Sequence, residues 1–213
     1  MKKIFILISI ILISFGISLL IYSVYQDKKL QHTNEELLEE FFDNYDDSVE
    51  VQEQAPVEDT SNNQKIQSNV NYLAVIEIPN ISLNTGIVMS DSNYNTMNKH
   101  VSIYPTSDMP NIDNGNFILF AHNGSSRVSY FRNIYKLDVN DKIYIYYNNQ
   151  KYTYKVIKNY DVSMYNSTPL NRIDNKTIIT LITCKSGSNK YRTIIVGELV
   201  EWYMKLQKIM IVS

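Results

Sequence analysis

The only cysteine of the chain, Cys184, ends an apolar run and is followed eight positions later by Arg192. The run 178–184 is rich in β-branched residues, and the polar segment 185–189 indicates a tight turn before a second strand. Residues directly opposed on paired strands have Cβ atoms about 4.5–5.5 Å apart. A guanidinium at that distance favours a thiolate and can hold an oxygen on which negative charge develops. Cys184 and Arg192 are therefore a candidate nucleophile and a candidate oxyanion-stabilising group.

A thiolate that attacks an acyl group also needs an acid for the leaving group, and histidine suits this task near neutral pH. The chain has three histidines. We expect His32, in an acidic segment, and His100, in a polar turn, to be surface residues. His122 ends the apolar run 116–122 and meets a polar loop, so it is a strand-end residue like Cys184. His122 is the candidate general acid/base.

Non-catalytic interpretations of these residues stay open at this point. A lone cysteine often packs as a small hydrophobic residue, and a strand-end histidine often lies at the edge of a core. The first alternative is therefore a membrane-anchored β-domain for adhesion or binding in which Cys184 is merely packed. The second is another exported cysteine acyltransferase or peptidase, although the S-x-G-C and C-G-S-C-W contexts of two such families are absent.

Three segments carry a family resemblance: NGNFILFAHNG at 114–124, TIITLITC at 177–184 and YRTIIVGEL at 191–199. They resemble the sortases, membrane-anchored cysteine transpeptidases of Gram-positive bacteria marked by a strand ending in TLxTC, a strand-end His and an Arg on the next strand. LAVIEIPNISLNTGIV at 73–88 is similar to the first strand of these enzymes. The resemblance covers roughly residues 72–200 in the family's order.

The resemblance implies a role for each matching residue. Cys184 would be the nucleophile, His122 the general acid/base, Arg192 the oxyanion or substrate-positioning group, and Thr183 a substrate-binding residue beside the nucleophile. The implied reaction cleaves an LPxTG-like sorting signal of a surface protein and transfers the acyl product to an amine, such as a cell-wall precursor or a pilin lysine. The implied chemistry requires no metal and no cofactor.

Two departures bear on the class of sortase. Ala121 stands where the family often has Gly before the His, and the segment 161–176 is too short for the long helix of class B members. The short loop between Cys184 and Arg192 and the N-terminal anchor favour class D or a compact class A or B relative. The segment 161–176 contains apolar residues and is our candidate for the wall of a peptide groove.

Beyond residue 70, short β-branched and aromatic runs alternate with Asn, Asp, Gly and Pro. This texture predicts an all-β domain over residues 71–203, and Asn148-Asn149 between two alternating runs indicates a hairpin. With the resemblance, we expect a closed barrel of about eight strands with short helices. Residues 204–213 form a C-terminal extension of unassigned role.

The N-terminus predicts a membrane anchor. Residues 4–25 are uncharged and apolar, long enough to cross a hydrocarbon layer that needs about 20 residues. A cleaved signal peptide is the alternative, but its apolar core would be shorter and would end at a small-residue cleavage site, which we do not find. We therefore expect one transmembrane helix over 1–25, with a cytoplasmic N-terminus and an extracellular catalytic domain.

Residues 26–70 carry twelve acidic residues against three lysines and have few core-forming residues after position 43. This composition predicts a largely disordered, self-repelling stalk, with one short helix near 33–42. The domain beyond it has an excess of about five positive charges without a concentrated basic stripe. Nucleic acid is therefore excluded as an expected partner.

Overall fold

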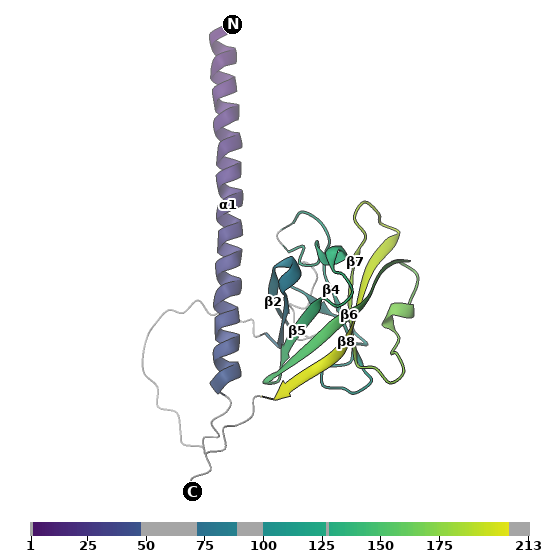
Figure 1. Ribbon diagram of the computed structural model, residues 1–213. Helices are drawn as coiled ribbons and strands as arrows, with labels where there is room; N and C mark the ends of the chain where they lie inside the picture. Colours follow the sequence, from purple (N-terminus) through teal and green to yellow (C-terminus); the bar gives the residue numbers. More distant parts are fainter. Residues whose placement is uncertain (1, 48–71, 89–99, 127, 205–213) are drawn as a thin grey trace. The chain divides into compact units, whose positions relative to one another are not determined.

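The computed structural model describes residues 2–47, 72–88, 100–126 and 128–204 (Figure 1). The chain divides into two compact units, residues 1–36 and residues 37–213. The C-terminal extension after Met204 and the part of the predicted stalk after Asp47 lie outside the described residues.

A single long helix, α1, runs from Lys2 to Asp47. By length and composition it contains a segment that can cross a membrane. The helix continues past the predicted end of the anchor at residue 25 and runs through the predicted short helix near 33–42 as far as Asp47. No helix begins near Thr33, whose hydroxyl Oγ1 instead donates to the carbonyl of Lys29 one turn earlier (3.0 Å). Leu, Glu, Lys and Gln favour helix, so this segment simply continues the helix that precedes it.

In the described part of the second unit there are eight strands and three 3₁₀ helices, besides the end of α1. The strands are β1 (Ala74–Ile78), β2 (Leu83–Ile87), β3 (Ser102–Ile103), β4 (Asn116–Phe120), β5 (Lys142–Tyr147), β6 (Gln150–Ser163), β7 (Ile178–Cys184) and β8 (Tyr191–Met204). The 3₁₀ helices are η1 (Pro79–Ile81), η2 (Ile134–Lys136) and η3 (Thr168–Leu170).

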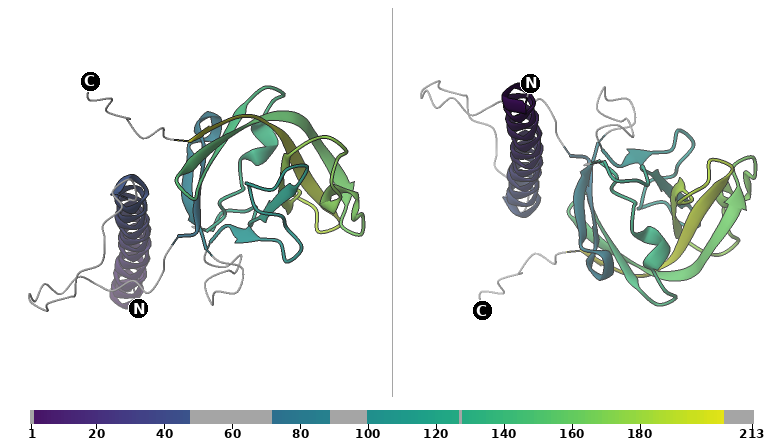
Figure 2. Two further views of the ribbon diagram at one scale, coloured as in Figure 1. Left: turned by 90° about the horizontal axis from the view of Figure 1, so that it is seen from below. Right: turned by 90° about the horizontal axis from the view of Figure 1, so that it is seen from above.

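The eight strands form one sheet in the order β2-β1-β5-β6-β8-β7-β4-β3. A parallel bridge between Ile87 and Val101 brings the two ends of the sheet together, so the sheet closes almost completely into a barrel. In the end-on views the long green β6 and yellow β8 curve around the core (Figure 2). The predicted eight-stranded β-barrel is confirmed.

The β5–β6 hairpin has the turn that the sequence predicted. Asn148 and Asn149 have φ values of 50° and 57°, which the asparagine side chain tolerates and which a type I′ turn requires at both positions. Tyr147 pairs with Gln150 across the turn. Within β5, Ile143 and Ile145 are buried while the alternate tyrosines are only partly covered, as expected for a strand with one face on the core.

Strand β7 is buried on both faces, which explains its continuous apolar run. Ile179 and Leu181 belong to the main core inside the barrel. On the other face, Ile178 and the partly buried Ile182 pack in a second cluster that also contains Ile194. Strands covered on both sides lose the polar alternation of half-exposed strands. Cys184, the last residue of β7, is thus positioned by a strand that packing holds from both sides.

One core residue carries an uncompensated polar group. Tyr154 has no exposed surface, and its hydroxyl has no hydrogen-bond partner among the described residues. A buried polar group without a partner costs about 1–3 kcal/mol. Burial also raises the pKa of the Tyr154 hydroxyl above its ordinary value, in keeping with an apolar surrounding.

We therefore expect Tyr154→Phe to raise the free energy of unfolding by about 1 kcal/mol. The matched control is Tyr146→Phe, which removes a hydroxyl that donates to Glu77 Oε2 (2.7 Å) and should lower stability by a similar amount. Urea unfolding of the full-length protein in detergent micelles measures both changes. A clear loss of stability in Tyr154→Phe would contradict this account of the core.

Candidate active site

Cys184 and Arg192 are opposed residues at the end of the β7–β8 hairpin. They form the last pair in the antiparallel register of β7 and β8. The connecting loop is closed by the Lys185 N–H, which donates to the carbonyl of Tyr191 (3.0 Å), and it contains Gly187 at φ 73°. The thiol of Cys184 is free and half-buried. The predicted cross-strand pairing of Cys184 with Arg192 is confirmed at the level of the backbone register.

His122 lies at the same edge of the sheet because β4 and β7 are parallel. Their register runs from Asn116 opposite Ile178 to Phe120 opposite Ile182. Parallel strands end at a common edge, so the residues that follow Phe120 are brought to the residues that follow Ile182. His122 is half-buried, and its carbonyl accepts a hydrogen bond from the Phe131 N–H (3.2 Å).

The three candidate residues therefore come from the ends of three neighbouring strands, β4, β7 and β8. His122 and Cys184 lie just beyond the last parallel pair, and Arg192 is the second residue of the neighbouring strand β8. The guanidinium of Arg192 donates through Nη1 to the carbonyls of Tyr191 (3.0 Å) and Asn189 (3.4 Å). Arg192 is thus tied to the β7–β8 loop, next to the thiol-bearing residue.

Thr183 lies on the opposite face of β7 from Cys184. Only 3% of its surface is exposed, and its hydroxyl donates to the carbonyl of Ala121 (2.7 Å). Asn123, to which the sequence assigned no role, donates through Nδ2 to the carbonyl of Cys184 (2.8 Å). The sequence signal for Asn123 was its place directly after the strand-end histidine, but only the fold shows which carbonyl it reaches. Direct contact of Thr183 with a substrate stays a prediction.

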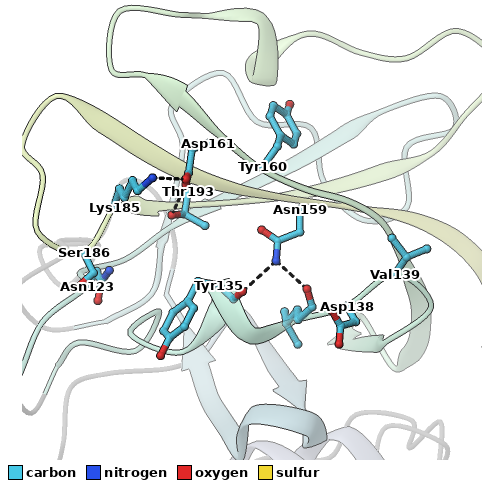
Figure 3. A pocket seen from close by; sticks show the side chains of 11 residues that line it. Asn123, Tyr135, Asp138, Val139, Asn159, Tyr160, Asp161, Lys185, Ser186 and Thr193 are labelled. Carbon is cyan, nitrogen blue, oxygen red and sulfur yellow. Dashed lines mark hydrogen bonds and ion pairs between the residues drawn. The ribbon is translucent and has the colours of Figure 1, made fainter.

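A pocket of about 570 Å³ borders the same strand ends, and its lining includes Asn123, Lys185 and Thr193 (Figure 3). Each of these directly follows one of the three candidate residues in the chain. Lys185 Nζ pairs with Asp161 Oδ2 (2.7 Å), and the Thr193 hydroxyl donates to Asp161 Oδ1 (2.8 Å). These bonds, that of Lys185 first, hold the pKa of Asp161 below its ordinary value. The ion pair joins the end of β6 to the residue after Cys184.

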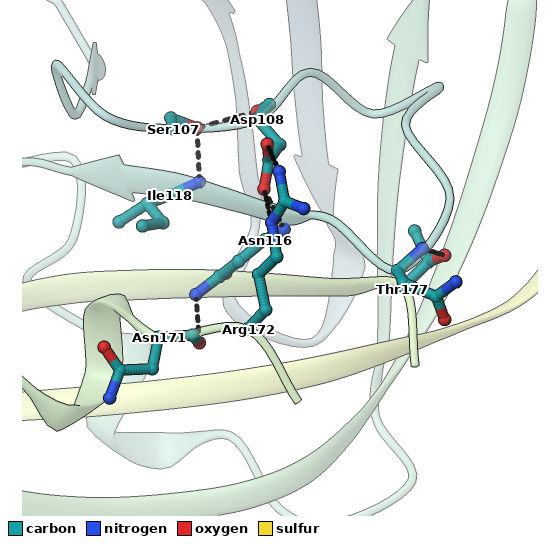
Figure 4. A network of polar contacts seen from close by, with 8 residues as sticks. Ser107, Asp108, Asn116, Ile118, Asn171, Arg172 and Thr177 are labelled. Atoms are coloured by element: carbon teal, nitrogen blue, oxygen red, sulfur yellow. Dashed lines mark hydrogen bonds and ion pairs between the residues drawn. The ribbon is translucent and has the colours of Figure 1, made fainter. Parts of the chain in front are cut away.

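The loop from β6 to β7 is fastened to the start of β4 through a buried amide. Asn116 Nδ2 donates to the carbonyl of Asn171 (3.0 Å; Figure 4). It also donates to the carbonyl of Pro169 (3.1 Å), and Asn116 Oδ1 accepts from the Thr180 hydroxyl (2.8 Å). Asn116 is only 1% exposed, so these bonds satisfy a side chain that would otherwise be costly to bury. One strand thus holds the β6–β7 loop at its start and carries His122 beyond its end.

A surface ion pair strengthens this anchor. The Arg172 guanidinium binds both carboxylate oxygens of Asp108, and Asp108 Oδ2 also accepts from the Asn116 N–H (2.8 Å) (Figure 4). The hydrogen bond from Arg172 is the main reason that the pKa of Asp108 lies below its ordinary value. The charged pair therefore ties the β6–β7 loop to the segment before β4.

Within the described ranges there is no group of three or more His, Cys, Asp or Glu side chains with the proximity that a metal site needs.

A comparison with protein families matches residues 76–200 to the model of the sortase domain. This chain belongs to the sortase family. Sortase A of Bacillus anthracis is 32% identical over 126 residues, which span 59% of this chain and 58% of that relative. This sortase thus covers less than two thirds of the length of that relative.

Solved structures show the same fold. Sortase C-1 of Actinomyces oris is 27% identical with a TM-score of 0.56, over 61% of this chain and 74% of that one. Sortase E1 of Streptomyces coelicolor is 26% identical with a TM-score of 0.55, over 62% and 89%. A sortase D5 of Clostridium perfringens, at 24% identity and a TM-score of 0.57, covers 80% and 98% and supports the fold alone. Because these relatives carry four different class letters, the class of this sortase stays open.

The Asp108–Arg172 pair generates a prediction about acid stability. A carboxyl whose pKa is lower in the folded state contributes stability that is complete above its unfolded pKa, about 3.9, and is lost as the pH falls through the folded value. We expect Arg172→Met to bring the pKa of Asp108 back toward its ordinary value. The variant should therefore be less stable than the wild type at neutral pH and lose less stability on acidification, so that the two curves converge below about pH 4. Thermal unfolding between pH 2 and pH 7 measures the difference.

The control is Arg132→Met, because Arg132 donates to the backbone carbonyls of Ser126 and Ser129. Its effect on stability should not vary with pH over the same range. Parallel pH curves for wild type and Arg172→Met would contradict the assigned cause of the Asp108 shift.

Proposed function

We propose that this sortase is a cysteine transpeptidase that cleaves an LPxTG-like sorting signal and transfers the acyl product to an amine acceptor. In this proposal Cys184 is the nucleophile, His122 the general acid/base and Arg192 the oxyanion-stabilising group. The observation that carries it is the origin of these three residues from the adjoining ends of β4, β7 and β8. This is the set of side-chain types that acyl transfer through a thioester needs.

The first half-reaction forms the thioester. Cys184 Sγ attacks the carbonyl carbon of the signal's threonine, and the carbonyl oxygen takes up negative charge that Arg192 stabilises by hydrogen bonding. The tetrahedral intermediate then collapses as the bond from carbon to the glycine nitrogen breaks. His122 gives its proton to that nitrogen, so the C-terminal fragment leaves as a neutral amine. The acyl group remains on Cys184.

The second half-reaction reverses these roles. The acceptor amine attacks the thioester carbon, and His122 takes the proton that the amine loses. The carbon–sulfur bond breaks, which regenerates the Cys184 thiolate and releases an amide product. The natural acceptor in this proposal is a cell-wall precursor, with a pilin lysine as the other candidate of the same chemistry.

An apolar surface beside Cys184 supports a peptide substrate with apolar residues. Strand alternation places Ile182 on the same face of β7 as Cys184, and Ile194 on the same face of β8 as Arg192. Val162 of β6 pairs with Arg192 and packs in the same cluster. We propose that these side chains form the floor under the Leu-Pro part of the sorting signal.

The β6–β7 loop supplies the wall of this site in the proposal. Met164 and Tyr165 expose 42% and 86% of their surfaces, which leaves apolar area free for a ligand. The second half of the loop is held by Asn116 and by the Asp108–Arg172 pair. A wall fastened in this way recognises a peptide without first having to be ordered, which favours binding.

The apolar helix α1 supports a membrane location. We propose that it crosses the membrane once, with the N-terminus in the cytoplasm and the barrel outside the cell, where the substrates are surface proteins that carry a sorting signal. Lys2 and Lys3, directly before the apolar segment, favour this orientation.

The nucleophile assignment predicts a covalent intermediate. When the full-length protein in micelles is mixed with a sorting-signal peptide and an amine, we expect mass spectrometry to find the N-terminal fragment of the peptide attached to Cys184. Cys184→Ala should form neither the adduct nor the amide product. Product formation by Cys184→Ala would reject the assignment, and an unmodified wild type with every peptide tested would favour a binding module instead.

The oxyanion assignment predicts a kinetic effect. We expect Arg192→Ala to lower kcat/KM by roughly 100-fold or more, because loss of one oxyanion donor costs about 10²–10³ in rate. Arg132→Ala is a suitable control, since Arg132 lies outside the proposed site and binds only backbone carbonyls in the described structure. Unchanged kinetics of Arg192→Ala would remove Arg192 from the mechanism.

A further inference from the structure

The backbone pairing of β4 with β7 stops before it reaches the residues that matter for the proposed chemistry. The register ends with Phe120 opposite Ile182, and the Ala121 N–H makes one more bond, to the carbonyl of Ile182 (3.3 Å). His122 and Cys184 both lie beyond this point. Backbone pairing alone therefore does not fix the distance between the two segments that carry them.

Two side chains continue the connection where the backbone pairing stops. The Thr183 hydroxyl donates to the carbonyl of Ala121 (2.7 Å), and Asn123 Nδ2 donates to the carbonyl of Cys184 (2.8 Å). The two bonds run in opposite directions, one from the β7 segment and one from the β4 segment. They hold the residues on both sides of His122 to the last two residues of β7.

We propose that Thr183 and Asn123 are positioning residues that set the placement of His122 relative to Cys184. This inference rests on the proposed function and deepens it. The two side chains are called the clamp below. Both side chains donate to backbone carbonyls, so the clamp fixes the backbone on either side of His122. The direction of the imidazole depends on the position of this backbone.

The burial of Thr183 supports a positioning role. The side chain is 3% exposed and lies on the barrel side of β7, whereas Cys184 points to the other face. Its hydroxyl acts on the chain at Ala121, one residue before His122. A displacement of about 1 Å between reacting groups can lower the rate on the order of 100-fold. A small shift of the backbone at His122 is therefore expected to lower the rate of catalysis.

The register of the sheet offers a matched control. Thr193 of β8 pairs directly with Thr183, and both are almost completely buried, at 4% and 3% exposed. The hydroxyl of Thr193, however, donates to Asp161 (2.8 Å) and not to the segment that carries His122. Thr183→Val and Thr193→Val thus make the same chemical change at the same depth, and only the first removes a clamp bond.

The first measurement is steady-state transpeptidation by the full-length protein in micelles. We expect Thr183→Val and Asn123→Ala each to lower kcat by about 10- to 100-fold with little change in KM, because the clamp lies away from the proposed peptide floor. Thr183→Ser, which keeps the donor, should recover most of the lost rate, and Thr193→Val should stay close to wild type.

The second measurement needs no peptide substrate. The rate of Cys184 alkylation by iodoacetamide is followed as a function of pH for wild type, His122→Ala and the clamp variants. We expect His122→Ala to move the profile to higher pH, since a nearby imidazolium favours the thiolate. The clamp variants should move it part of the way. The other charged groups near Cys184, namely Arg192, Lys185 and Asp161, are kept in all variants.

The outcomes separate the clamp from the proposed function. A shifted profile in His122→Ala with unchanged profile and kcat in both clamp variants overturns the clamp and leaves the proposed mechanism standing. An unchanged profile in His122→Ala overturns both, because there is then no coupling for the clamp to hold. Equal effects of Thr183→Val and Thr193→Val would assign the change to general loss of stability and overturn the proposal. If Thr183→Val does not fold, the half-buried Asn123→Ala decides the question alone.

Discussion

Strands β4 and β7 run parallel in a sheet whose other strand pairs are antiparallel. A parallel pair cannot be joined by a tight turn, so a long connection must intervene between its strands. Here that connection contains η2, the β5–β6 hairpin and η3. Closing this long connection costs chain entropy, but it brings the ends of β4 and β7 to one edge of the sheet. An antiparallel neighbour brings its first residues to this edge, as β8 does with Arg192, and its last residues to the opposite edge.

The rest of the barrel stiffens this edge. Apolar side chains cover β7 on both faces, and β7 pairs with β8 from Ile178 to Cys184. The start of β4 is held through Asn116, and the residues past its end through Thr183 and Asn123. Interiors packed at crystal-like density deform little, so strand ends supported in this way keep their spacing. The hydrogen bonds then fix the positions of the segments before and after β4, which apolar packing alone does not determine.

Much of this architecture could be predicted from local sequence. The pairing of Cys184 with Arg192 follows from a short hairpin, and the Asn148-Asn149 turn follows from the preference of asparagine for positive φ. Both features depend on residues close together in the chain. The continuation of α1 to Asp47 was missed because its acidic, amide-rich composition also suits a disordered chain.

The long-range polar contacts could not be predicted. Asn116 and Asn123 look like ordinary strand-edge asparagines in the sequence, yet each reaches a carbonyl more than 50 positions away. Which carbonyl an amide meets depends on the register of the parallel pair, and no local pattern encodes that register. For the same reason, the sequence placed Thr183 beside the nucleophile but did not show that its hydroxyl faces Ala121.

The free, half-buried sulfur of Cys184 has a chemical consequence of its own. A thiolate oxidised to a sulfenic acid is usually rescued when a second thiol of the same protein condenses with it to a disulfide. This chain has no other cysteine. Rescue of an oxidised Cys184 therefore depends on a thiol supplied by another molecule, and without one, further oxidation to the sulfinic acid is permanent.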